Sequence, residues 1–181
     1  MEKSFVELVR QTLKDAHDSL EGTMNDVTEE AAHWQPQGKA LPLAVAYGHV
    51  IVSEDMILNG WIRKSKLLID QGWSDKMGLN LPHPAMDADW EKNFVEWSKK
   101  LKMDLKKFKE YAQAVYKQSD DYLAGLTDKD LFEQKIDLSV WGLGDWTLGR
   151  FILRFMISHV DNLTGEISAV KGLQGLKGYP F

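Results

Sequence analysis

The sequence predicts an all-α protein: a four-helix up-down bundle with crossover connections and short extra helical turns. Apolar residues recur at three- and four-residue steps over four long stretches, and no segment alternates apolar and polar residues as a half-buried strand would. Long helices joined by a few connections are typical of a bundle. The 181 residues, 44% of them hydrophobic, are expected to form one domain over 1–181.

The first half of the chain supplies two of the long helices. The first is expected over residues 4–24, followed by a short helix over residues 28–34 with Thr28 as its N-cap. The second long helix is expected from Pro42 to about residue 68. It is apolar over most of its circumference, so we expect it inside the bundle.

The second half contains the one long connection and the other two helices. Residues 70–88 hold several glycines and prolines, and a loop of this length is often functional or covers a pocket. The third long helix is expected over residues 89–126, and a short helical segment over residues 127–134. The fourth is expected over residues 147–172, followed by a glycine-rich tail that docks on the body.

Composition restricts the possible functions. The net charge of −5 argues against nucleic-acid partners and against binding to a membrane surface. No apolar run is long enough to span a membrane, and the N-terminus lacks a signal peptide, so we expect a cytoplasmic protein. The absence of cysteine excludes disulfides, zinc–thiolate sites and a protein-borne thiol nucleophile.

Two histidines, His49 and His159, lie on apolar faces of helices that are far apart in sequence. Taken singly, each is expected to be a core histidine bonded to a neighbouring polar group. The neighbours that could serve are Ser53 and Glu54 for His49, and Asp161 and Asn162 for His159. Taken as a pair, the two histidines predict a shared cavity between the second and fourth long helices.

Several stretches in a fixed order carry a resemblance to a known family. They are Trp34-Gln35-Pro36, residues 48–55 (GHVIVSED), 119–123 (SDDYL), 126–131 (LTDKDL), 159–167 (HVDNLTGEI) and 171–178 (KGLQGLKG). With this pattern the chain resembles the DinB-like superfamily, four-helix proteins that include small-molecule thiol transferases. The resemblance implies a homodimer. It also implies a metal site built from one histidine of the second helix and two, one turn apart, of the fourth.

Only two of those three ligand positions are histidines in this chain. The resemblance maps the positions onto His49, His159 and Leu163, and a leucine has no lone pair to donate. Catalytic zinc sites normally have three protein ligands and one open position. We therefore expect a degenerate metal site, with His49 and His159 as its remaining ligands. The other candidates to line the cavity are Glu54, Asn162, Leu163 and Glu166.

Two functions follow as expectations. The first is a bundle that binds a small-molecule ligand at the degenerate site, without an assigned catalytic residue. The alternative is a transferase that depends on a divalent metal, zinc or nickel, and uses a low-molecular-weight thiol cofactor. The lack of cysteine fits the alternative because the cofactor would bring the nucleophile, whereas Leu163 argues against it. His17, His33 and His83 match no ligand pattern.

Overall fold

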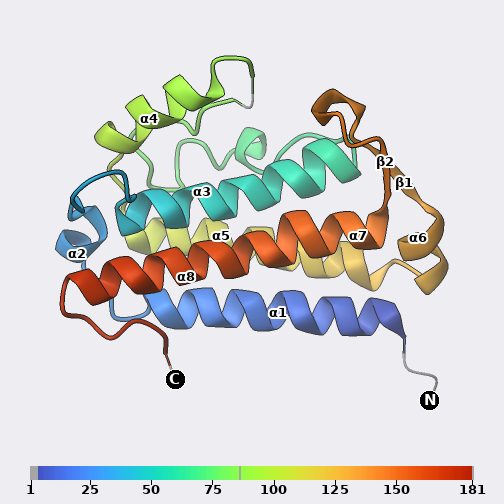
Figure 1. Ribbon diagram of the computed structural model, residues 1–181, viewed down its shortest axis with the longest axis horizontal. Coiled ribbons are helices and arrows are strands. Elements are labelled where there is room, and N and C mark those ends of the chain that lie inside the picture. The colour runs from blue at the N-terminus through green and yellow to red at the C-terminus, as the bar shows by residue number, and fades with distance from the viewer. Residues whose placement is uncertain (1–3, 86, 181) are drawn as a thin grey trace.

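Long helices lying side by side dominate the structure (Figure 1). The computed structural model describes residues 4–85 and 87–180. Its long elements are α1 (Phe5–Met24), α3 (Leu43–Asp55), α5 (Leu105–Ala124) and α8 (Ser158–Leu173). Both α1 and α3 pack against α5 and against α8. The helical class expected from the sequence is therefore confirmed.

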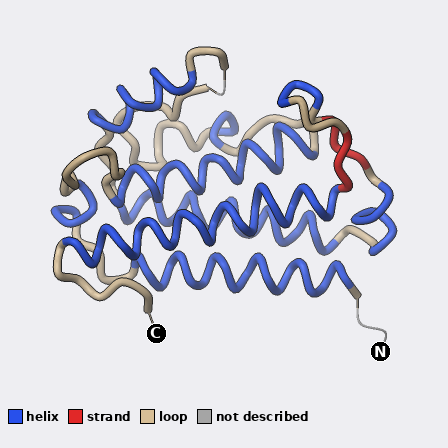
Figure 2. Tube along the Cα trace, viewed as in Figure 1, coloured by secondary structure: helices blue, strands red, loops and turns tan. Residues whose placement is uncertain are grey.

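Shorter elements accompany the long helices. They are α2 (Glu29–His33), α4 (Trp90–Lys100), α6 (Asp128–Glu133), α7 (Leu148–Ile152), β1 (Lys135–Asp137) and β2 (Asp145–Thr147). The two strands pair antiparallel, with Lys135 opposite Thr147, beside α6 (Figure 2). The sequence did not predict this sheet, because a three-residue strand is too short to show alternation.

Side-chain caps explain where several of these helices begin. Thr28 accepts a hydrogen bond from the amide of Ala31 at the start of α2, and Thr127 forms a capping box with Asp130 at the start of α6. These two starts agree with the sequence. At the start of α5, Asp104 accepts a bond from the amide of Lys107 at 3.1 Å.

The third long helix expected over 89–126 is wrong, because the structure breaks it into α4 and α5 between Leu101 and Asp104. Met103 is held elsewhere: it pairs with Leu79 as an isolated β-bridge, and its amide donates to Nε2 of His33 at 2.9 Å. Both contacts join segments far apart in the chain, so the apolar rhythm of the sequence could not show them.

The second long helix also ends earlier than expected. After α3 the chain makes a π-helix over Met56–Ile62 and then leaves the helix axis. The reason is the buried carboxylate of Asp55, which accepts hydrogen bonds from the amides of Leu68 at 2.9 Å and Ile69 at 3.1 Å. These bonds turn the chain back over α3 where the sequence predicted further helix.

The other helices expected from the sequence are confirmed. α1 occupies the first expected range, and α7, the π-helix Leu153–Ile157 and α8 together fill the fourth. The tail after α8 docks on the body as expected, since Nε2 of Gln174 donates to the carbonyl oxygen of Ala31 at 3.2 Å. Phe181 lies outside the described residues. Among the helices that are described, none has the length and apolar character needed to cross a bilayer.

α3 lies in the core of the molecule. Every residue of this helix is buried except one, His49, which is only partly exposed. Two of the buried residues, Glu54 and Asp55, carry carboxylates, and burying a charge is costly unless hydrogen bonds compensate it. α3 therefore carries a partly exposed histidine and two buried carboxylates that need hydrogen-bond donors within the protein.

Candidate functional site

The structure brings together the two histidines that the sequence singled out. His49 of α3 and His159, the second residue of α8, have ring centroids 5.2 Å apart, and their rings are nearly perpendicular at 86°. The π-helix Leu153–Ile157 directly precedes α8. π-helical turns are rare and often mark functional sites. The pairing expected from two distant helices is thus present.

A third histidine, His83, reaches the same place from the long connection. Its Nε2 lies 3.2 Å from Nδ1 of His49, and the two rings are nearly parallel at 9°. Its Nδ1 lies 3.0 Å from the carbonyl oxygen of Pro84. Met86 of this connection lies outside the described residues. The loop expected over residues 70–88 therefore contributes a side chain to the site.

The hydrogen bonds determine which ring nitrogens carry protons. The carbonyl of Pro84 can only accept, so Nδ1 of His83 is the donor and its Nε2 accepts in the neutral ring. Nδ1 of His49 must then donate to Nε2 of His83, with Ser53 Oγ also 3.3 Å from it. This assignment leaves the lone pair of His49 on Nε2.

Aromatic side chains from α4 cover the histidines. The ring of Phe94 meets His49 edge-on with centroids 5.0 Å apart, and Trp90 lies 5.7 Å from the same ring. Trp97 packs against His83 at 5.0 Å. In Figure 1, α4 lies over α3 on the side away from α1. The site is therefore a cluster of imidazoles under an aromatic cover.

All three rings have lowered pKa values. Burial lowers the pKa of His49 to about 3, with smaller contributions from His159 and His83. Burial lowers the pKa of His83 to about 4, although the hydrogen bond to the carbonyl of Pro84 raises it somewhat. Burial also lowers the pKa of His159, which the charge of Glu54 partly offsets. The three imidazoles are neutral at physiological pH.

The other residues expected to line the cavity lie in different surroundings. Leu163 is buried in the apolar core, and Glu54 is buried with its carboxylate bonded to His17 and Ser119. Asn162 and Glu166 are exposed on α8. Of these four candidates, Glu54 acts on a site histidine through its charge on His159.

The donors present do not fit the three-ligand metal site that the family resemblance implies. Leu163 offers no lone pair at the third position, and both ring nitrogens of His83 are already hydrogen bonded. Within residues 4–85 and 87–180, no three histidine or acidic side chains are arranged to hold an ion. His49 keeps a free lone pair on Nε2, so it could supply one donor, but His83 could join it only by giving up its bond to His49.

Sequence reasoning missed His83 and the aromatic cover. His83 stands between Pro82 and Pro84 in a loop, where no helical period links it to His49. Trp90 and Phe94 lie on an apolar stripe that the sequence assigned to the third long helix. A histidine flanked by prolines in a long connection was the one available signal, because prolines hold a loop in a fixed course.

Comparisons with known proteins give the family. No curated protein matches the chain. A solved structure of a conserved protein from Enterococcus faecalis is similar, with a TM-score of 0.74 and 21% identity, covering 94% of this chain and 99% of that one. A sibling lethal factor precursor, DfsB, is similar with a TM-score of 0.65 and 14% identity, covering 97% and 99%. Identities this low support the fold alone. The sequence model of the DinB superfamily matches residues 12–162, most of the chain, and the protein therefore belongs to the DinB superfamily.

Proposed function

We propose that this protein binds a small organic molecule at the cluster of His49, His83 and His159. The support comes from ring nitrogens that have no partner within the protein. In the described part of the chain no hydrogen bond is formed by Nε2 of His49 or by either ring nitrogen of His159. Such atoms are rare in a protein interior, where polar groups are normally paired.

These nitrogens are nevertheless accessible. No buried side-chain nitrogen or oxygen among the described residues lacks a hydrogen-bond partner, so the unpaired nitrogens of His49 and His159 must touch solvent. A partly buried imidazole that keeps an open nitrogen is suited to accept or donate a hydrogen bond to a ligand. This pair of open imidazoles is the observation that carries the proposal.

The surroundings indicate the kind of ligand. Nε2 of His49 offers an acceptor and the neutral ring of His159 offers one donor and one acceptor. Phe94 and Trp90 offer aromatic faces and edges beside them. A ligand with one hydrogen-bonding group and a planar or apolar body matches this lining. Phenols and aromatic amides are the simplest members of that class.

The test is a titration followed by the ring-nitrogen NMR signals of the histidines. We expect phenol or benzamide to shift the ring nitrogens of His49 and His159 saturably, while those of His33, which lies outside the cluster, stay in place. The variant His159→Leu replaces the imidazole with an apolar side chain of similar size. It should weaken binding about tenfold or more. If both compounds leave the rings of His49 and His159 unchanged, or if His159→Leu binds as the wild type does, the proposal is wrong.

The alternative is a metal-dependent transferase that uses a low-molecular-weight thiol. One observation favours it: the three imidazoles are neutral, which is the form that binds a metal. The missing third ligand at Leu163 opposes it, and both ring nitrogens of His83 are already engaged in hydrogen bonds. Metal content of untagged protein grown with zinc or nickel decides between the two. Near-stoichiometric metal that is lost in both His49→Ala and His159→Ala would favour the transferase.

A homodimer in the cytoplasm completes the proposal. Apolar side chains at one end of the molecule support an interface, since Val140 and Leu143 are exposed in the connection between β1 and β2. Sedimentation velocity should show a dimer that Val140→Asp weakens. A monomer at all concentrations would remove this part of the proposal without touching the ligand site.

A further inference from the structure

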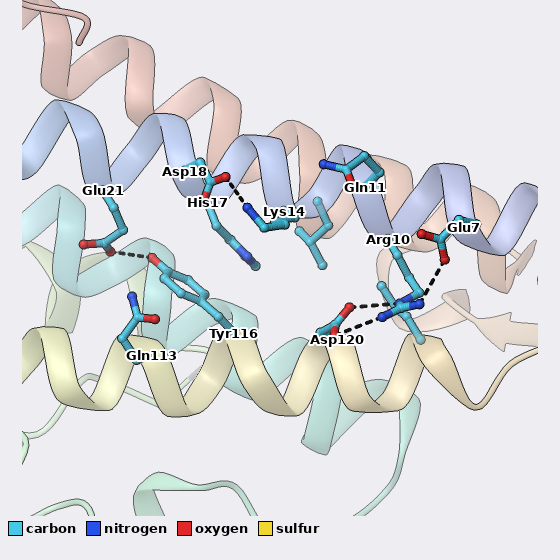
Figure 3. Close-up of a pocket in the computed structure, with 12 residues that line it drawn as sticks. Glu7, Arg10, Gln11, Lys14, His17, Asp18, Glu21, Gln113, Tyr116 and Asp120 are labelled. Carbon is cyan, nitrogen blue, oxygen red and sulfur yellow. Dashed lines mark hydrogen bonds and ion pairs between the residues drawn. The ribbon is translucent and has the colours of Figure 1, made fainter.

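A groove between α1 and α5 forms a cavity of about 310 Å³, away from the histidine cluster (Figure 3). Volumes of this order accommodate small-molecule ligands. Its lining combines a buried imidazole, His17, a tyrosine, Tyr116, and several charged side chains. In the sequence His17 falls within the first long helix and matches no ligand pattern.

His17 is buried, with 6% of its surface exposed, and is fixed from behind by a carboxylate. Its Nε2 lies 2.7 Å from Oε2 of Glu54, and Oε1 of Glu54 accepts a hydrogen bond from Ser119 Oγ at 2.6 Å. Because a carboxylate accepts the Nε2 proton, Nδ1 carries the lone pair of the neutral ring. An imidazole oriented in this way presents a defined acceptor.

That acceptor is open. His17 makes no second hydrogen bond among the described residues, and no buried side-chain nitrogen there lacks a partner. Nδ1 is therefore in contact with solvent, and His17 is one of the residues that line the cavity. The ring cannot turn freely, since it stacks on Tyr116 with centroids 3.8 Å apart.

One helical turn beyond His17, Glu21 provides a second acceptor on the same wall. Its Oε1 accepts hydrogen bonds from the hydroxyls of Tyr47 and Tyr116, each at 2.7 Å. Burial raises the pKa of both phenols well above their usual value, so both remain donors. Within the described chain no lysine or arginine pairs with Glu21, and its Oε2 accepts no hydrogen bond.

The lining is acidic overall. Arg10 is already paired with Asp120 and Glu7, and Lys14 with Asp18 (Figure 3). Its charged members are the carboxylates of Glu7, Asp18, Glu21 and Asp120 and the cations of Arg10 and Lys14, which leaves a net charge of −2. A cationic ligand is thus attracted, and its apolar part can lie against Leu13 and Leu123.

We propose that this groove binds a small primary amine, whose ammonium group donates hydrogen bonds to Glu21 and to Nδ1 of His17. The apolar body of the amine would lie along Tyr116 towards Leu123. The groove shares no lining residue with the histidine cluster. The amine-binding proposal can therefore be tested separately from the function proposed above.

Three probes of one shape test the charge requirement: benzylamine, benzyl alcohol and benzoate. Binding to the full chain is followed by the ring-nitrogen signals of His17 and the backbone amides of α1 and α5. We expect benzylamine to shift these signals saturably, with an affinity at least tenfold above those of the other two compounds.

The variant Glu21→Gln removes the charge while its amide oxygen can still accept from the tyrosines, and it should weaken benzylamine about tenfold or more. Glu110→Gln on the exposed side of α5 makes the same change in net charge outside the groove and should bind as the wild type does. The proposal is overturned if benzoate or benzyl alcohol binds as well as benzylamine. It is also overturned if both variants weaken binding equally, or if no probe shifts the His17 signals.

Discussion

Nδ1 of His49 donates a hydrogen bond to Nε2 of His83 across 3.2 Å, which ties the long connection to the centre of α3. The bond joins the one partly exposed residue of α3 to a loop that also carries the approach to α4. The state of the site therefore depends on whether this contact is made.

Replacing His83 tests that dependence. In His83→Ala the Nδ1 of His49 loses its partner on His83 and water enters, so the pKa of His49 should rise from about 3 towards its ordinary value. Titration of the ring nitrogens by NMR measures the change. The exposed contact of Lys14 with Asp18 provides a control, because Lys14→Met should leave His49 unaffected. An unchanged pKa of His49 in His83→Ala would show that His83 does not exclude water.

The lowered pKa values also predict how stability varies with pH. His83 has a pKa of about 4 in the folded protein and about 6.5 when unfolded, so the unfolded chain binds the extra proton between these values. Its contribution is fully present above pH 6.5 and is lost as the pH falls towards 4. The loss is at most about 1.4 kcal/mol per pH unit, and less to the extent that the ring is solvated.

Denaturant unfolding at several pH values checks this dependence. The free energy of unfolding should fall less steeply between pH 6.5 and 4 in His83→Ala than in the wild type. Carboxylates titrate in both proteins, so the difference between the two slopes isolates the histidines. Equal slopes would mean that neither His83 nor its neighbour is held neutral by the fold.

Glu54 is expected to be important for stability. It is 1% exposed and accepts hydrogen bonds from His17 and Ser119, so Glu54→Gln should destabilise the protein by about 2 kcal/mol. Since its charge raises the pKa of His159, the same variant should lower that pKa further. Thermal unfolding and an NMR titration of His159 measure the two effects. Glu133→Gln, on the exposed side of α6, should change neither.

A metal site should be restored by Leu163→His. The new imidazole would stand one turn after His159 on the same face of α8, which adds a third donor to His49 and His159. Added zinc or nickel should then raise the melting temperature by roughly 5 °C or more at a large excess over its dissociation constant. Leu173→His, at the exposed end of the same helix, is the matched control. No difference between the two variants would place Leu163 outside the site.

Much of the fold could be predicted because local sequence patterns determine its helices. The burial of α3 follows from its apolar circumference, and the start of α6 from the threonine and aspartate of its capping box. The break before α5 could not be predicted, because the apolar rhythm continues through Leu101 and Leu105 while Met103 is held by Leu79 and His33. The up-down order of a four-helix bundle and the single domain stay predictions.

The site was predictable to the same degree. His49 and His159 each lie on the apolar face of their own helix. Their proximity could therefore be inferred from the helical periodicity and from the family resemblance. His83 comes from a loop, and His17 is one residue away from the stripe of Ala16, so their partners depend on tertiary packing. A helical period says which face of its own helix a residue occupies, but it does not say what the other segments bring to that face.

Glu54 links the groove and the histidine cluster through its charge. One of its oxygens bonds His17 in the groove of α1 and α5, and its charge acts on His159 in the histidine cluster. A ligand that alters the charge of Glu54 would therefore alter the proton affinity of His159. Reciprocity requires the converse in equal measure: protonating His159 would alter the affinity for that ligand by the same factor.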